Sequence, residues 1–381
     1  MKLMYISDGE MCLFDGADAR VIPSQRVDQY ARTLRELEQQ HAWKTEGEGA
    51  KFMHKVNPYA NAAERQRGVV TGLAPYRDGV LYAVDLGRTG GVYTKDPLSP
   101  EEPEGLVTSA VGLHAQDFAV CGDGFYLAMH EGAQRHIAHM DPATGNYEFL
   151  TEGDTLERHP FPSKDGRSIH FDMCGFARNE QQQLTARGPS AIVSLNLISG
   201  DIREVYADAG TEYLKYTESA DGTQRMLVRP YQEKRRGSNP LGCLLAPFSA
   251  IAGFIYLFSS LNNARKGKEP PMSSSGAEAA QQREQPLYID DVAIDPKQIA
   301  REQAHSKDDY PGLIPRDWTL QRILGDGSLE VVQRGVLDYL PLQDDGYIYS
   351  NGAHVFRVDA SGARSHLFKA HLATDFILLG E

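Results

Sequence analysis

The sequence ends on the apolar stretch Asp375-Phe376-Ile377-Leu378-Leu379, and this stretch decides the predicted fold. It resembles Asp117-Phe118-Ala119-Val120 and Asp338-Tyr339-Leu340-Pro341-Leu342 earlier in the chain. Each of these earlier strands opens a unit of about four predicted strands, whereas Asp375 is followed by too few residues to open one. The last strand therefore needs strand partners from elsewhere in the chain.

The N-terminus offers those partners. Lys2–Ser7, Glu10–Asp15 and Ala19–Pro23 are predicted to be three strands that no leading strand precedes. If the last strand completes this first unit, the repeated units close into a ring, which is the arrangement of a β-propeller. We therefore predict an all-β fold, a single β-propeller over residues 1–381, in which the N- and C-terminal strands close one blade.

Turn signals repeat through the chain and support this interpretation. Asp-Gly recurs at Asp8, Asp78, Asp123, Asp165, Asp221 and Asp345, each time just before a β-rich run. Glycine supplies the positive φ that tight hairpin turns need. Pro160–Phe171 fits the pattern Pro-x-x-Ser-x-Asp-Gly-x-x-Ile-x-Phe and resembles the repeat of WD40-like, TolB-type propellers. The resemblance implies a propeller fold and no specific function.

Counting the units predicts six blades. The alternative is seven blades, with the seventh contained in the long fifth unit. The predicted blades are Met1–Pro23 with the C-terminal strand, Gly68–Lys95, His114–Thr151, Arg158–Ala207, Glu212–Gln333 and Val336–Phe368. A helical insertion at 24–42 follows the first blade, because Val27, Tyr30, Leu34 and Leu37 recur at helical spacing after the N-cap residue Ser24. We expect this amphipathic helix to pack across a blade edge.

Composition excludes several classes of protein. The 381-residue chain has 41% hydrophobic residues and a net charge of -13, which supports a folded core and argues against nucleic acid as a partner. Its four cysteines are widely spaced, so neither a disulfide framework nor a zinc site is expected. No cofactor motif is present. The first residues show no secretory signal, and we expect a cytoplasmic protein.

An apolar insert interrupts the fifth blade. Residues 241–261 carry no charge, and the basic residues Lys234-Arg235-Arg236 and Arg265-Lys266 flank them in an otherwise acidic chain. With the tether that follows, this segment defines an insertion at 233–285. Leaving its large side chains in water would forfeit about 1.5–3 kcal/mol each, so something must cover them. The candidate contact residues are Leu244, Leu245, Phe248, Ile251, Phe254, Ile255, Leu257 and Phe258.

Three environments could bury the apolar side chains of this insert. A full bilayer crossing would separate the closing strand from the first blade, so we prefer a segment that enters one leaflet or lies in the interface, where basic flanks favour anionic headgroups. The alternatives are burial against a partner protein or a second copy, and packing on the propeller itself.

Two groups of residues are candidates for a ligand site. Strand alternation places His170, Asp172 and Cys174 on one face, where they form either a site or a polar blade interface. Asp117, Asp338 and Asp375 stand at matching positions in three units, where they either ring the mouth of the central channel or accept backbone N–H bonds. No complete catalytic motif is present.

These observations predict a non-catalytic propeller that serves as a scaffold or protein-interaction module, associated with a membrane through 241–261. Its protein partner is not identified by the sequence. The alternative is a hydrolase, a lyase or a ligand-binding protein that uses the central channel, because propellers host enzymes as well as scaffolds. Convergence of the candidate residues around one cavity would favour that alternative.

Overall fold

The computed structural model describes residues 1–42, 67–122, 124–132, 134–179, 181, 184–231, 287–289, 292–294, 298–299, 301–302 and 309–379. The chain divides into two units. The larger comprises Met1–Arg235 and Asp309–Glu381, and the smaller comprises Arg236–Asp308. Within the smaller unit, β19 (Leu287–Ile289) and β20 (Val292–Ile294) pair as an antiparallel hairpin.

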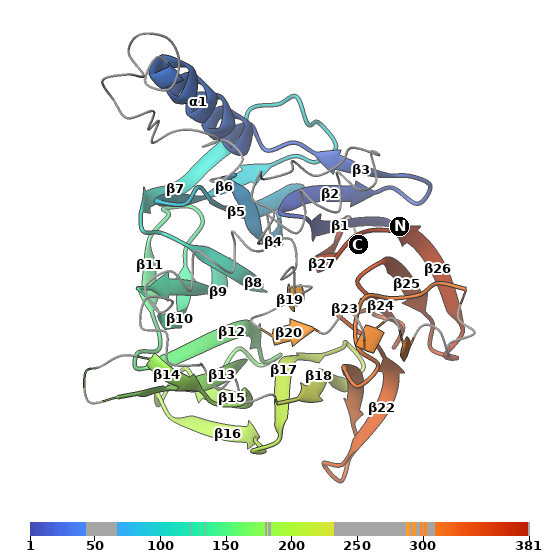
Figure 1. Cartoon of the computed structure of the whole chain (residues 1–381). Helices are drawn as coiled ribbons and strands as arrows, with labels where there is room; N and C mark the ends of the chain where they lie inside the picture. Colours follow the sequence, from blue (N-terminus) through green and yellow to red (C-terminus); the bar gives the residue numbers. More distant parts are fainter. Residues whose placement is uncertain are drawn as a thin grey trace, which may run out of the picture. The chain divides into compact units, whose positions relative to one another are not determined.

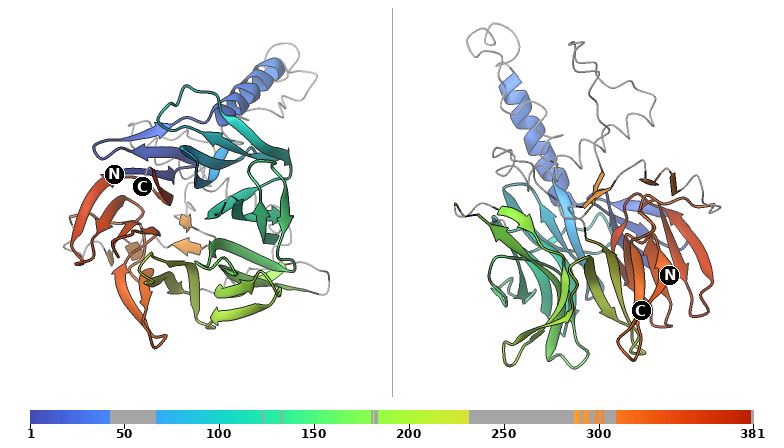
Figure 2. Two further views of the ribbon diagram at one scale, coloured as in Figure 1. Left: turned by 180° about the vertical axis from the view of Figure 1, so that it is seen from behind. Right: turned by 60° about the horizontal axis from the view of Figure 1, so that its bottom comes forward.

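The described strands of the larger unit form six blades around a common axis (Figures 1 and 2). From the axis outward, the first blade contains β27 (Thr374–Leu379), β1 (Lys2–Ser7), β2 (Glu10–Phe14) and β3 (Ala19–Ile22). The second contains β4 (Val69–Tyr76), β5 (Gly79–Asp85), β6 (Thr89–Lys95) and β7 (Gly105–Val111). The third contains β8 (Ala115–Cys121), β9 (Gly124–Glu131), β10 (Gln134–Met140) and β11 (Tyr147–Phe149).

The other three blades follow the same order. The fourth contains β12 (Thr155–Pro162), β13 (Ser168–Arg178), β15 (Ala191–Asn196) and β16 (Ile202–Tyr206), with β14 (Leu184–Arg187) pairing the far end of β13. The fifth contains β17 (Thr211–Glu218), β18 (Gln224–Pro230), β21 (Thr319–Ile323) and β22 (Leu329–Arg334). The sixth contains β23 (Asp338–Pro341), β24 (Tyr347–Ser350), β25 (His354–Val358) and β26 (Arg364–Lys369).

The third and fourth blades are joined by a single parallel pairing of β10 with β12, Arg135 opposite Leu156. Every pairing inside a blade is antiparallel and extends over several residues. We therefore count the continuous nine-stranded sheet as two blades.

The predicted closure of the ring is confirmed. β27 lies antiparallel to β1, with Lys2 opposite Leu379 and Met4 opposite Ile377, and the two chain ends lie side by side in Figure 1. The Asp8-Gly9 turn then connects β1 to β2 with φ of 59° and 72°, the double positive φ of a tight hairpin. Because the last strand sits inside the first blade, the ring holds both termini.

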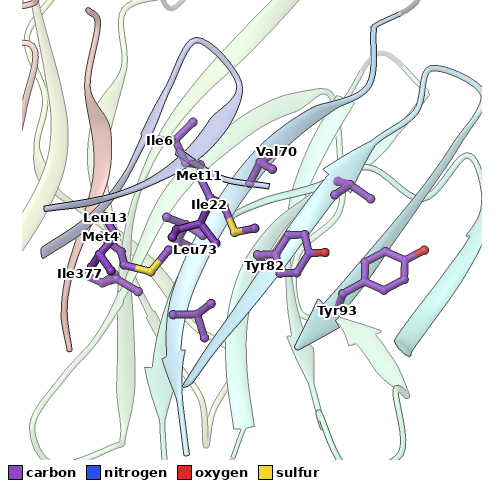
Figure 3. Close-up of a cluster of buried hydrophobic side chains, with 12 residues drawn as sticks. Met4, Ile6, Met11, Leu13, Ile22, Val70, Leu73, Tyr82, Tyr93 and Ile377 are labelled. Carbon is purple, nitrogen blue, oxygen red and sulfur yellow. The ribbon is translucent and has the colours of Figure 1, made fainter. Parts of the chain in front are cut away.

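Hydrophobic clusters fill all six interfaces between neighbouring blades. Alternation along β1 sends Met4 and Ile6 into a cluster with the second blade, and Leu3 and Tyr5 into a cluster with the sixth. Figure 3 shows the first of these clusters, where Ile377 of the closing strand lies beside Met4. Four further clusters join the remaining neighbours in turn. The core is thus a closed circuit of blade-to-blade contacts.

The predicted helix is confirmed as α1 (Gln25–His41). The hydroxyl of Ser24 accepts the Val27 N–H at 3.3 Å and so caps the first turn. Glu104 accepts the backbone N–H of Gln25 at 2.9 Å, and a carboxylate is favoured at a helix N-terminus. These contacts fix the start of the helix on the second blade, while its later turns project outward (Figure 2).

The second blade differs in detail from the sequence prediction. The predicted second blade ended at Lys95, but β7 adds an outer strand at Gly105–Val111. In the fifth blade, the strands that follow β18 in the sheet are β21 and β22, after the smaller unit. The apolar segment 241–261, with all eight of its predicted contact residues, lies outside the described residues.

Candidate functional site

Four of the six inner strands carry the same irregularity. In each, two residues lie opposite one on the neighbouring strand, which is a β-bulge. The first bulged residue is charged or ionisable and has a left-handed backbone: Asp117 on β8, His159 on β12, Lys215 on β17 and Asp375 on β27, with φ between 48° and 53°. Non-glycine residues rarely adopt this conformation, and it is least expected for lysine. The bulges therefore gather four polar side chains near the axis.

Asp338, at the start of β23, joins three blades. Its Oδ1 accepts a hydrogen bond from Lys215 Nζ of the fifth blade and its Oδ2 accepts the Asp375 N–H of the first blade at 2.7 Å. The same carboxylate accepts the backbone N–H of Tyr339 at 2.7 Å. The Tyr339 hydroxyl donates to the Lys215 carbonyl oxygen at 2.8 Å, which helps to fix the backbone of the bulge.

Asp172, on the second strand of the fourth blade, is the most deeply buried of the charged residues near the axis. Its side chain is 0% exposed and contacts Arg158 Nε at 3.1 Å and His159 Nδ1 at 2.6 Å. Its Oδ1 also accepts the Lys215 N–H at 3.1 Å. Asp117 makes a similar contact from the third blade, where its Oδ2 lies 3.4 Å from the His159 amide nitrogen. Carboxylates thus hold the bulge amides of the fourth, fifth and first blades.

We define the axial cluster as seven ionisable residues near the axis: Asp117, Arg158, His159, Asp172, Lys215, Asp338 and Asp375. Its electrostatics follow from its composition. Four carboxylates face three cations. Burial alone would raise the pKa of Asp172, but the charges of His159 and Arg158 hold it well below its usual range. Burial would lower the pKa of His159, yet Asp172 and Asp117 raise it to about 9.

Asp375 holds the surplus negative charge of the cluster. Burial, reinforced by the neighbouring carboxylates of Asp117 and Asp338, raises the pKa of Asp375 to about 7. Lys215 and His159 partly oppose that shift. When Asp375 is protonated, three carboxylates balance three cations, so the neutral form of this one group completes the charge balance.

The structure brings the three aspartates of the second predicted group together and divides the strand-face trio. Asp117, Asp338 and Asp375 interact electrostatically near the axis, in the company of Lys215. His170 instead lies with its ring 4.7 Å from the ring of Tyr216 in the fifth blade. Cys174 is buried, at 1% exposure. Of the strand-face trio, Asp172 joins the axial cluster, through its contacts with Arg158 and His159.

His159 and Lys215 belong to the site and were missed in the sequence analysis. The signal that could have found them is positional. His159 and Lys215 are each the first of the two residues in their bulge, the position that Asp117 and Asp375 hold in other blades. The position is the same, but the residue type differs. Asp338 matches Asp375 by residue type, and yet its strand pairs with β24 without a bulge.

The described residues hold no group of three or more His, Cys, Asp or Glu side chains placed to bind a metal ion. A surface pocket with a volume of about 340 Å³ lies in the fourth blade beside Ser190, Glu204 and Asp208, and no member of the axial cluster lines it. Among the described helices, none is long and apolar enough to span a bilayer.

The shifted pKa of Asp375 predicts a pH-dependent stability. An acid with a folded-state pKa of about 7 and an unfolded-state value near 3.8 contributes stability below pH 4 that is lost as the pH rises to 7. Asp375→Asn removes the titration and keeps a residue that tolerates a left-handed backbone. We therefore expect the free energy of unfolding of this variant, relative to that of the wild type, to be higher at pH 8 than at pH 5.

Urea denaturation at both pH values measures this effect. The matched control is Asp18→Asn in an exposed turn, for which the difference from the wild type should be the same at both pH values. An Asp375→Asn difference that is also independent of pH would show that the carboxyl does not titrate in this range.

Comparisons with known proteins find similar chains among solved structures alone. No protein-family model matches the sequence, and no curated protein matches it either. Among solved structures, TolB from Acinetobacter baumannii is similar over 98% of this chain and 65% of its own, with 10% identity and a TM-score of 0.49. The tricorn protease is similar over 97% of this chain and 34% of its own, with 9% identity and a TM-score of 0.46.

A putative TolB from Agrobacterium tumefaciens is similar over 80% of this chain and 82% of its own, with 12% identity and a TM-score of 0.42. This chain thus spans less than two thirds of the length of the first two structures. At these identities the likeness concerns the fold alone. The chain is an all-β protein that resembles TolB-type β-propellers at the level of fold.

Proposed function

We propose that this chain is a non-catalytic β-propeller that presents its rims and loops to a partner protein and is held at the cytoplasmic face of a membrane by residues 241–261. The observation that supports the non-catalytic role is the pairing at the axis. Lys215 contacts Asp338, and Asp172 contacts both Arg158 and His159. A catalytic acid, base or nucleophile must face its substrate. In this cluster the ionised side chains are already paired with one another, within the fourth blade at Asp172 and between the fifth and sixth blades at Lys215 and Asp338.

The alternative role, catalysis or ligand binding at the axis, has one observation in its favour. Four of the predicted site residues gather there. The side chains of His159 and Lys215 remain 21% and 18% exposed. However, His159 is already paired with Asp172, and Lys215 is already paired with Asp338. These pairings give the two bulged residues a structural role. A structural role, within the fourth blade and between the fifth and sixth, accounts for the same contacts without a ligand.

The membrane role is supported by the sequence of the insert. Twenty-one uncharged residues stand between two basic runs in a chain of net charge -13. Anionic headgroups attract such basic flanks with about 1 kcal/mol for each Lys or Arg near the surface. The insertion point follows β18, the second strand of its blade, so removing the insert leaves the pairing of β18 with β21 available.

Vesicle flotation tests this proposal directly. The full chain, a variant lacking 237–285, and a control that replaces 241–261 with 21 Gly and Ser residues are mixed with phosphatidylcholine vesicles, with or without phosphatidylserine. We expect the full chain alone to float, more with phosphatidylserine, and to resist release by high salt. A full chain that stays soluble and monodisperse without floating would overturn the membrane role.

A further inference from the structure

Two histidines on the outer part of the sixth blade lie in direct contact. His354 opens β25 and His366 lies in β26, and His354 Nδ1 is 3.1 Å from His366 Nε2. A bulge in this strand pair places His366 opposite Phe356, two residues beyond His354 on the same face. Both rings therefore reach one patch of the blade surface.

Aromatic neighbours hold the two rings in place. The ring of Tyr310 stacks on His366 at 4.2 Å between centroids and 7° between planes, and it meets His354 edge-on at 5.3 Å. Phe356, which is fully buried, meets His366 edge-on at 5.6 Å. The Asn351 side-chain amide donates to the Tyr310 carbonyl oxygen at 3.1 Å, which anchors the stacking residue. The pair is thus arranged before any ligand arrives.

We propose that His354 and His366 form a two-histidine binding site for a divalent transition-metal ion. Imidazole nitrogens bind Zn²⁺ at about 2.0–2.1 Å. With both nitrogens at that distance from one ion, a separation of 3.1 Å gives an N–metal–N angle of roughly 98°, between the octahedral and tetrahedral angles. Water molecules complete the coordination.

The chemistry of the patch selects the class of ion. Hard cations such as Ca²⁺ and Mg²⁺ prefer oxygen ligands, whereas imidazole suits Cu²⁺, Ni²⁺ and Zn²⁺. Lys369 is paired opposite His354, and Arg364 lies over the Phe356 ring at 4.8 Å. These cations oppose purely electrostatic capture, so affinity must come from nitrogen coordination. Cu²⁺ should bind most tightly and Zn²⁺ more weakly, in the usual order for nitrogen ligands.

A bound ion would join β25 to β26, the outermost strand of the blade, and so stabilise the folded chain. The test uses the tag-free full chain after treatment with EDTA. Cu²⁺, Ni²⁺ and Zn²⁺ are titrated by calorimetry, and the copper complex is examined by electron paramagnetic resonance. We expect one saturable site with the signature of two coordinated imidazole nitrogens, together with a rise in Tm.

His354→Ala and His366→Ala should each weaken Cu²⁺ binding by at least about tenfold, because each removes one of two ligands. His139→Ala, on β10 of the third blade, is the matched control and should bind as the wild type does. If a substituted chain has a lower Tm in EDTA, His366→Gln replaces it, since it keeps a polar side chain of similar reach. Equal Cu²⁺ binding by the wild type and both histidine variants, or no saturable binding by the wild type, would overturn the proposal.

Discussion

Deletion of Thr374–Glu381 is expected to leave a chain that cannot close its ring and that unfolds or aggregates under native conditions. The deletion removes β27, whose Phe376 and Ile377 are buried in the clusters on either side of the first blade. Burying two such side chains contributes about 1.5–3 kcal/mol each, and net stability of a domain is only about 5–15 kcal/mol. The loss also exposes the edge of β1, an open template for aggregation.

A circular permutant provides the control for this deletion. Moving Thr374–Glu381 to a position ahead of Met1 restores β27, and because Lys2 is paired with Leu379, the new connection is a short hairpin loop. We expect the permutant to be monomeric in gel filtration and to show the thermal transition of the wild type. A deleted chain that is equally stable would show that β27 does not close the ring.

Asp172→Ala is expected to cost about 3–5 kcal/mol of unfolding free energy, the range for breaking one side of a buried ion pair. Asp172 and Arg158 have side chains only 0% and 5% exposed, so the substitution leaves the guanidinium buried without its carboxylate. It also removes the acceptor of the Lys215 N–H, at a bulge that already holds an unfavourable backbone conformation. Urea denaturation at pH 7 measures the loss.

Asp154→Ala is the matched control, because Asp154 pairs with Arg178 at the surface, with side chains 43% and 23% exposed. Solvent screens that pair, so its removal should change stability little. The wild type should also lose the Asp172 contribution on acidification, since a depressed pKa stabilises the folded state only above the ordinary titration range. If Asp172→Ala costs no more than Asp154→Ala, the axial pairing does not stabilise the ring.

The closure of the ring was predictable because recurring turn residues and alternating apolar residues mark the repeat in the sequence. The Asp375 strand repeats two earlier strands that open blades, and the three N-terminal strands lack a leader. The helix was predictable because a capping serine precedes residues at helical spacing. β7 was not, because it follows a Pro- and Glu-rich run and its residues are largely exposed, so no alternation marks it.

The axial cluster was only partly predictable, since comparison by residue type finds Asp117 and Asp375 but cannot find Lys215 or His159. What these four share is a backbone position, a left-handed residue in a bulge, which several residue types occupy. The His354 and His366 pair was not predictable for a similar reason. The two stand twelve residues apart, and only the bulged register of β25 and β26 brings them together.

The central claim is that the last strand of the chain lies beside the first, and a disulfide cross-link tests it most directly. Lys2→Cys and Leu379→Cys are introduced together into a Cys121→Ser, Cys243→Ser background, because Cys12 and Cys174 are buried. The two engineered residues are direct partners in the register of β1 and β27. A mismatched control pairs Lys2→Cys with Arg364→Cys on the outer strand of the sixth blade.

We expect mild oxidation to join Lys2→Cys to Leu379→Cys quantitatively in the folded chain. The product should migrate as a covalently closed monomer in non-reducing electrophoresis and show a higher Tm, whereas the mismatched pair stays open. Failure of the matched pair to cross-link in a folded chain, or equal cross-linking of both pairs, would contradict the closure of the first blade by the C-terminal strand.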